Sequence, residues 1–279
     1  MNVELADERL LVIQDRFSMD HAEGRASTRR IEAFGTLARV TGFLNKPRDD
    51  DFELVYRERR LQPFWRLICT GVYDYERMRR YVVKVAPEVR SVRIVDQAPP
   101  VANGEFALEG LETCREELRR ETFYDGLSKT ANPLLEAYLK YDAAAVTPDA
   151  LKAVSDDGTI VVPPLAKASE LVRDSLGGVI AKIEADTVLE EQIRIEAVDL
   201  FYRPVYAFRY RWQGKEAVVE FDGLTGEVRT GGATFEQYLG KVLEPGFLLN
   251  VGVEAAALFI PGARLAEIVV SKGLSLARS

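Results

Sequence analysis

The sequence predicts an α+β protein that contains two related antiparallel β-hairpin modules, with intervening and C-terminal helices. Two regions, residues 52–94 and 192–230, are rich in β-branched and aromatic residues and contain turn-forming residues, which is typical of strands. The regions between and after them carry apolar residues at helical spacing. The two strand-rich regions also match each other in part, and this similarity indicates an internal duplication.

Five regions are expected along the 279 residues, a length that suits one large domain or two modest ones. They are an N-terminal helical segment (1–50), a first β module (51–98), a mainly helical connector (99–190), a second β module (191–232) and C-terminal apolar helices (233–279).

The composition is that of a folded globular protein, with 47% hydrophobic and 29% charged residues. The net charge of −7 disfavours indiscriminate binding to nucleic acid. The opening residues lack a basic region followed by an apolar core, so we expect no secretory signal and a cytoplasmic location. Cys69 and Cys114 form no metal-binding or redox motif, and we expect both to be free buried thiols.

Helices are expected where apolar residues recur at spacings of three and four. The first covers residues 26–44. Residues 111–123 interleave Glu and Arg at these spacings, which favours an exposed helix face. Shorter helices are expected at 132–141 and at 147–154, where Thr147 is the N-cap, and a longer one at 163–185.

The second β module contains the clearest hairpin. A two-residue turn at Gln213–Gly214 pairs Trp212 with Lys215 and, further along, Tyr206 with Phe221. This register places on the core side Tyr206, Phe208, Tyr210, Trp212, Ala217, Val219 and Phe221. The other side, expected to face water, carries Arg209, Arg211, Glu216, Val218 and Glu220.

A tight turn is expected directly after this hairpin. Asp222 can cap the turn through its carboxylate, and Gly226 can adopt the left-handed backbone conformation before the chain continues as a strand.

An earlier stretch matches the second module. Leu54, Tyr56, Arg57, Pro63 and Trp65 align with Leu200, Tyr202, Arg203, Pro204 and Tyr206, and residues 81–85 align with 217–221. The first module is therefore expected to contain several strands, with Gly71 and Asp74 in a turn. Duplication and convergent strand patterning both account for the match.

The second module, about residues 195–230, resembles PepSY-type modules. The features that carry the resemblance are a strand with a Pro-aromatic pair, a Val-rich strand and an Asp-x-x-Thr-Gly turn, here residues 204–206, 217–221 and 222–226. The resemblance implies a binding or regulatory module, of a kind linked to peptidase inhibition, and it implies no catalytic residues.

No catalytic, cofactor-binding or metal site is predicted. His21 is the single histidine, too few for a zinc or His-based nucleophile arrangement. Neither a nucleophile elbow nor a phosphate-binding glycine loop is present. No small-molecule ligand is inferred.

The segment 57–93 carries ten Lys or Arg residues against four acids. Arginines interleaved with aromatic rings are typical of single-stranded nucleic-acid sites. The residues hypothesised to contact nucleic acid or an acidic partner are Arg57, Arg59, Arg66, Arg77, Arg79, Arg80, Tyr73 and Tyr75. In the alternative interpretation the rings face the core and the arginines pair with acidic helices of the same chain.

The C-terminal region 247–276 is apolar and punctuated by glycine. We expect a helix pair for core packing or self-association, with a membrane-surface anchor as the alternative. The expected interface residues are Phe247, Leu248, Leu258, Phe259, Ile260, Leu265 and Ile268.

The function expected from these patterns is that of a non-enzymatic binding, scaffold or regulatory protein. It would act through protein–protein contacts and self-association. The alternatives are a nucleic-acid-associated factor that uses residues 57–93 and a membrane-surface-associated protein that uses the C-terminal helices.

Overall fold

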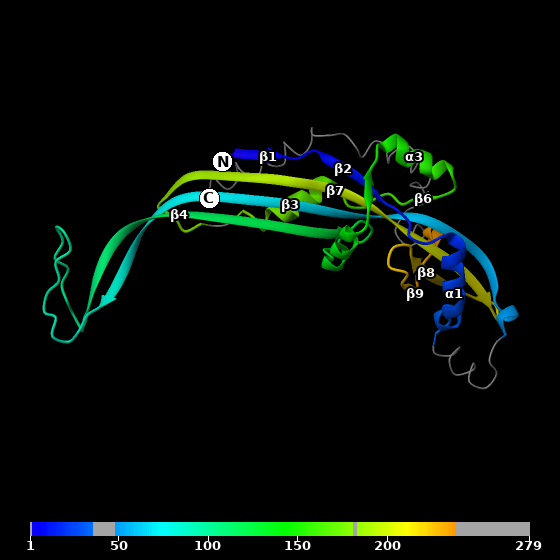
Figure 1. Cartoon of the computed structure of the whole chain (residues 1–279), viewed down its shortest axis with the longest axis horizontal. Helices are drawn as coiled ribbons and strands as arrows, with labels where there is room; N and C mark the ends of the chain where they lie inside the picture. Colours follow the sequence, from blue (N-terminus) through cyan, green and yellow to red (C-terminus); the bar gives the residue numbers. More distant parts are fainter. Residues whose placement is uncertain (1, 36–47, 181–182, 238–279) are drawn as a thin grey trace.

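The computed structural model describes residues 2–35, 48–180 and 183–237. The described chain forms an elongated, curved sheet with a few short helices packed against it (Figure 1). The expected α+β class is confirmed at this level. The strands are β1 (Asn2–Leu5), β2 (Glu8–Ile13), β3 (Glu53–Lys84), β4 (Glu105–Asp125), β5 (Ala143–Ala145), β6 (Ile160–Val161), β7 (Thr187–Trp212), β8 (Lys215–Asp222) and β9 (Val228–Thr230). The helices are α1 (Met19–Ala33), α3 (Pro148–Asp156) and α4 (Ala168–Leu176), with the 3₁₀ helices η1 (Asp49–Asp51) and η2 (Pro133–Lys140).

Three long strands organise the sheet. β3 lies between β4 and β7 and is antiparallel to both. The side of β7 that faces away from β3 is covered in succession by β1 and β2, which are parallel to it, and by β8, which is antiparallel. The path through the sheet is β4-β3-β7-β2-β5, with β9 beside β8 and β6 beside β3.

The turn expected at Gly71 and Asp74 is wrong, because β3 is one continuous strand of 32 residues. Gly71 pairs with Leu118 on one side and Ile193 on the other. A Cβ atom on Gly71 would lie 2.8 Å from Val179 Cγ1. This glycine therefore permits a close approach of chain segments instead of making a turn. The two related hairpin modules are not confirmed, since residues 54–85 lie along β3 and do not fold back on themselves.

The helix expected at 111–123 is also wrong, and the connector 99–190 contains the long strand β4. Spacings of three and four between Glu and Arg suit a helix, but the same residues also alternate along a strand. Tertiary pairing decides between the two, because β4 pairs with β3 along its whole length without a register shift.

The other helices differ from expectation mainly in their ends. α1 begins at Met19, earlier than the predicted 26–44, because the Ser18 side chain accepts a hydrogen bond from the backbone N–H of His21. Residues 36–44 of that prediction lie outside the described residues. The Thr147 cap of α3 is confirmed, as its hydroxyl accepts from Ala150 N at 3.2 Å. Residues 133–140 form the 3₁₀ helix η2, and the helix expected at 163–185 is limited to α4, which ends before Gly177.

The hairpin of the second module has the predicted register, from Trp212 with Lys215 to Tyr206 with Phe221. Its aromatic side packs against α1 through Tyr206, Phe208, Tyr210, Val219 and Phe221. The opposite side is ionic as expected, with Arg209 and Arg211 beside Glu216. It does not face water throughout, because Val218 is buried.

The turn after this hairpin also forms as predicted. Asp222 Oδ1 accepts the backbone N–H groups of Leu224 and Thr225 at 2.9 and 3.0 Å, and Gly226 has a φ of 76°. The carboxylate that caps the turn is thus held inside the protein.

The core runs along the sheet in three connected clusters. The largest lies under α3 and α4 and includes Trp65, Leu67, Leu171, Val198 and Leu200. A second, on the opposite face, stacks Phe64 on Phe201 beneath η2, and the third lies under α1. No helix in the described part of the chain is long and apolar enough to cross a membrane.

A buried ionic cluster joins β3 to the end of the described chain. Arg60 donates to Glu58 at 2.9 Å, to Glu220 at 2.5 Å and to the carbonyl of Ala233 at 2.7 Å. Glu58 in turn accepts from the backbone N–H of Phe235 at 2.9 Å. These contacts fix residues 233–235 against the sheet.

A second buried cluster joins η2 to the hairpin. Arg203 donates to Asp222 at 2.8 Å, and Tyr138 donates its hydroxyl to the same carboxylate. Burial opposes ionisation of Asp222, but Arg203, Tyr138 and the two backbone N–H groups together hold its pKa below its ordinary value of 3.8. Burial also raises the pKa of Tyr138 to about 12, so it remains a hydrogen-bond donor.

We predict that Asp222→Asn lowers the free energy of unfolding by about 3 kcal/mol, because Arg203 then loses its buried counter-ion. Since the pKa of Asp222 is depressed on folding, its contribution is complete above pH 3.8 and is lost as the pH falls below that value. Urea unfolding of wild type and variant should therefore differ at pH 7 and converge in strong acid.

The matched control for this prediction is Asp96→Asn, at an exposed position. It should leave the free energy of unfolding unchanged within about 0.5 kcal/mol. A wild-type-like stability of Asp222→Asn at pH 7 would contradict the assignment.

Candidate functional site: the arm and the outer edge of β4

One end of the sheet extends as a two-stranded ribbon. β7 stops pairing with β3 at Glu76, opposite Thr187. Beyond this point residues 77–84 of β3 pair only with residues 105–112 of β4, and the loop 85–104 connects them. We call residues 77–112 the arm. It projects from one end of the molecule (Figure 1).

One face of the arm is held by a polar lock. Tyr81 donates its hydroxyl to one oxygen of Glu112, and Arg77 donates to the other at 2.7 Å. The hydrogen bond from Tyr81, followed by that from Arg77, lowers the pKa of Glu112 and keeps it ionised. The Tyr81 ring also covers Gly110, where a Cβ atom would lie 3.2 Å from it. The lock therefore fixes the two strands to each other.

The other face of the arm exposes apolar side chains. Met78 and Leu111 lie directly opposite each other, and Val82 follows on the same face, with exposed fractions of 56%, 58% and 55%. The opposed charged pair Arg80 and Glu109 lies between them on this face. An isolated two-stranded ribbon is marginally stable in water, and exposed apolar groups on it are typical of a surface that contacts another molecule.

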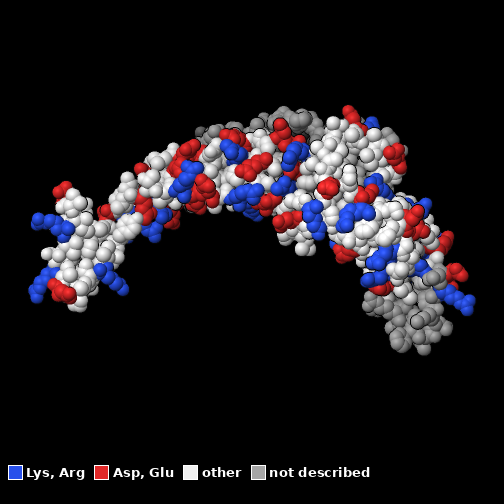
Figure 2. Space-filling view, viewed as in Figure 1, with Lys and Arg blue, Asp and Glu red and all other residues white. Residues whose placement is uncertain are grey.

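The arm as a whole is nearly neutral, because it contains six Lys or Arg residues and five Asp or Glu residues. Figure 2 shows blue and red side chains alternating with white surface at this end. The positive charge that β3 brings to the arm is therefore balanced by acids of β4 and of the loop 85–104.

The residues hypothesised to contact nucleic acid are distributed along β3 and are not gathered in one site. At about 3.3 Å per residue, Arg57 and Arg80 are about 75 Å apart along the strand. Arg57 pairs with Glu23 at 3.0 Å and Arg59 with Asp15 at 2.5 Å.

Five of the remaining six residues of that hypothesis also contact their own chain, whereas Arg80 is exposed on the arm. Arg66 pairs with Glu121 at 2.7 Å, and Arg79 lies 4.0 Å from Glu112. Tyr73 is buried and donates its hydroxyl to the Val179 carbonyl at 3.0 Å. Tyr75 is also buried. The alternative interpretation therefore agrees in part: Tyr73 and Tyr75 are buried, and Arg57 pairs with an acid of helix α1. Arg66 and Arg79 pair with acids of strand β4 and not of a helix.

The outer edge of β4 is the second feature. Phe123 O accepts from Asn132 N and Asp125 N donates to Thr130 O, so the odd-numbered residues of β4 direct their backbone groups away from β3. In the described residues these two contacts cover the edge at 123–125, and Ala102 exchanges backbone hydrogen bonds with Glu105 at the other end. No strand of the described residues pairs with the edge over 107–121, so this part of β4 presents a row of backbone donors and acceptors.

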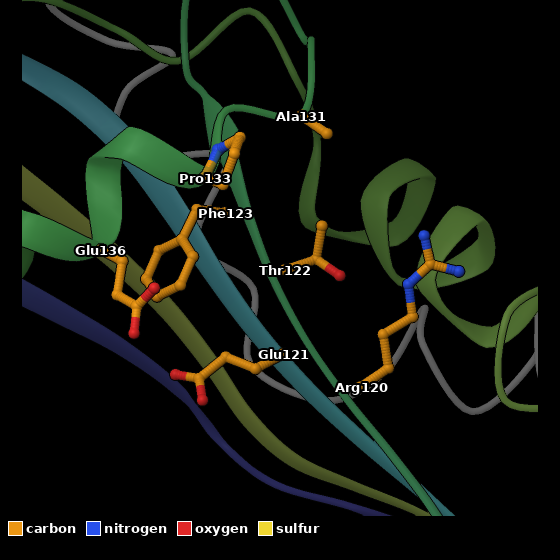
Figure 3. A pocket seen from close by; sticks show the side chains of 7 residues that line it. All are labelled: Arg120, Glu121, Thr122, Phe123, Ala131, Pro133 and Glu136. Carbon is orange, nitrogen blue, oxygen red and sulfur yellow. The ribbon is translucent and has the colours of Figure 1, made fainter.

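A cleft of about 290 Å³ lies where the open edge meets the covered one. Arg120, Glu121, Thr122, Phe123, Ala131, Pro133 and Glu136 line it. In Figure 3 Glu121 and Glu136 point to one side of β4, whereas Arg120 points to the other, toward the helices. The cleft therefore follows the strand edge and carries two carboxylates on one side, of which Glu121 pairs with Arg66.

Charged side chains alternate in sign along one face of this edge. Arg115, Glu117, Arg119 and Glu121 occupy every second position. Arg115 pairs with Asp74 at 3.2 Å and with Glu117 at 2.8 Å. Burial works against ionisation of Glu121, but Arg66 and then Arg119 lower its pKa. Glu121 is thus held in its ionised form.

The thiols offer no reactive group here. Cys69 and Cys114 are both free, as expected. Cys69 is buried, and burial raises its pKa to about 11, whereas Cys114 is half-buried. In the described part of the chain, no three His, Cys, Asp or Glu side chains converge as a metal site would require. The C-terminal interface residues expected between Phe247 and Ile268 lie outside the described residues.

Comparisons with protein families, with curated proteins and with solved structures found no match for this chain. The geometry of the arm and of the β4 edge therefore carries the functional argument.

Sequence reasoning missed the β4 edge because it assigned this segment to a helix. The signal was nevertheless present in residues 115–121, where Arg and Glu alternate at every second position as well as at spacings of three and four. The arm was missed because a turn was placed at Gly71.

We predict that Glu112→Gln loosens the arm and leaves the rest of the sheet unchanged. The variant loses the charged acceptor shared by Tyr81 and Arg77. In hydrogen–deuterium exchange, peptides from 77–84 and 105–112 should exchange several-fold faster, and peptides from the helix-covered core should not change. Glu109→Gln, on an exposed arm position, is the control; equal effects of the two substitutions would contradict the lock.

Proposed function

We propose that this chain is a non-enzymatic binding or scaffold protein that acts through protein–protein contacts made by its arm and strand edges, including contacts with a second copy of itself. The observation that carries the proposal is the arm, a ribbon two strands wide with Met78, Val82 and Leu111 exposed on one face. In the arm, the ends of β3 and β4 continue past the core of the sheet as a two-stranded ribbon. Such a ribbon is available for contact with another molecule.

The arrangement of the sheet supports this function. β3 continues from the core into the arm without interruption, so the arm is attached to a long, twice-paired strand. The lock formed by Tyr81, Glu112 and Arg77 holds one face in a fixed shape while the other face presents apolar groups. Pre-organisation of this kind reduces the entropy lost on binding.

The resemblance of residues 195–230 to PepSY-type modules agrees with a binding role. In this chain the corresponding hairpin is packed against α1 and paired with β3, so its aromatic side is used for the core. Contacts with a partner would then fall on the arm and the edges, away from this hairpin.

We predict that substituting the apolar face of the arm abolishes partner capture. The protein is immobilised as bait, either as wild type or as a variant that carries both Met78→Lys and Leu111→Lys. The variant places two charges where a partner would bury two apolar side chains. Proteins from the cells that express the chain should be recovered with wild type and depleted at least roughly tenfold with the variant, measured by quantitative mass spectrometry.

The control bait is Leu134→Lys, which adds charge at an exposed apolar position on η2, outside the arm. It should recover the same proteins as wild type. Equal recovery by all three baits, with unchanged circular dichroism, would remove the arm from the proposed function.

A further inference from the structure

The outer edge of β4 carries a charge order that is self-complementary. Residues 115–121 read Arg-Glu-Glu-Leu-Arg-Arg-Glu. With Leu118 at the centre, each residue before it has the opposite charge to the residue at the same distance after it. Arg115 corresponds to Glu121, Glu116 to Arg120, and Glu117 to Arg119.

An antiparallel pair of identical strands makes this symmetry physical. If two copies of β4 pair about a twofold axis at Leu118, each residue of one copy lies directly opposite its counterpart in the other. Every charged residue from 115 to 121 then faces an opposite charge, and Leu118 faces Leu118. Opposite charges directly across a strand pair are stabilising, and like charges are destabilising.

Neighbouring registers lack this complementarity. Moving the second strand by two residues in one direction places Glu117 opposite itself, and in the other direction it places Arg119 opposite itself. A shift of one residue would set outward-directed backbone groups against inward-directed ones. Among these registers, only the one centred on Leu118 satisfies both charge and hydrogen bonding.

The backbone geometry fits this register. The odd-numbered residues 115, 117, 119 and 121 direct their N–H and C=O groups outward, and in the centred register odd residues face odd residues. They would exchange hydrogen bonds across the new pair. Leu118, an even residue, would form a non-hydrogen-bonded pair at the axis, where Cα atoms approach to about 4.5 Å.

The surroundings of the edge also fit. Arg115, Glu117 and Arg119 are exposed, so their charges are accessible to a second chain. The pairing segment ends where residues 131–132 begin to cover the edge at Phe123. At that end lies the cleft with Glu121 and Glu136, and an arginine at position 115 of the second copy would enter the side that carries these two carboxylates (Figure 3).

We propose that two copies of this chain form a symmetric dimer by antiparallel pairing of their β4 strands, residues 115–121, about an axis at Leu118. The proposal rests on the proposed function, since it assigns the self-contact of that function to one strand edge. The buried area of a seven-residue strand pair is small, so dissociation constants on the order of micromolar are expected.

The competing interpretation is that the charges protect the edge from any pairing. Charged side chains on edge strands serve this purpose in many proteins. Protection depends on the presence of charge and not on the order of signs, whereas the dimer depends on the order. Exchanging two signs therefore separates the two interpretations.

The test uses the full chain in analytical ultracentrifugation from about 1 to 100 μM, a range that brackets a micromolar dissociation constant. Wild type should change from monomer to dimer with concentration. Glu117→Arg sets arginine opposite Arg119 twice per dimer, and Arg119→Glu sets glutamate opposite Glu117 twice. Each should weaken dimerisation on the order of tenfold or more. The double variant restores opposite charges and should recover most of the dimer.

A cross-link tests the position of the axis. In a Cys114→Ser background, Leu118→Cys should form an intermolecular disulfide on mild oxidation, because the paired Cα atoms lie within disulfide range. Glu116→Cys is the control, since its two copies would be four residues, about 13 Å, apart along the strands.

Three results would overturn the dimer: a wild type that stays monomeric at 100 μM, a dimer that both single charge reversals leave unchanged, or equal cross-linking by the two cysteine variants. None of these results bears on the capture of partners by the arm, because that experiment substitutes Met78 and Leu111. Unchanged capture by the arm variant would in turn refute only the arm as a contact surface and would leave the dimer standing.

Discussion

The double pairing of β3 is the constraint on which the rest of the structure depends. This strand pairs with β7 over residues 53–76 and with β4 over residues 64–84, so it has a partner on both sides over 64–76. β3 and β7 are joined by more than a hundred residues of intervening chain, which includes β4, η2 and the helices α3 and α4. The length and curvature of β3 therefore determine where these segments can pack.

The two candidate surfaces follow from unequal strand lengths. β7 ends its pairing at Thr187 while β3 and β4 continue, and this difference creates the arm. β4 is the last strand on its side of the described sheet, and this position creates the open edge. Charged side chains on the sheet are mostly matched within the chain, as in the contact of Arg9 with the buried Asp199 at 2.7 Å. The arm and the edge are therefore the surfaces that we propose for contacts with another molecule.

How much could be predicted from sequence depended on how local the deciding contacts are. The hairpin at 204–228 was predicted with its register, because the Gln213–Gly214 turn and the alternation of rings are contained in 25 residues. Residues 111–123 could not be assigned, since their pattern suits a helix and a strand equally and the deciding partner is β3. Gly71 was misassigned for the same reason: it accommodates Val179, more than a hundred residues away. The arginines of β3 were recognised, but their acidic partners on β4 and α1 could be identified only from the fold.

Amide hydrogen exchange along β3, resolved by residue with NMR, tests the continuous strand most directly. Because β3 has a partner strand on each side, the N–H groups from Leu67 to Asp74 should all exchange slowly, including those of Gly71 and Asp74. Rapid exchange confined to Gly71–Asp74 would mean that the chain turns there. That result would contradict the single strand and, with it, the arm and the open edge of β4.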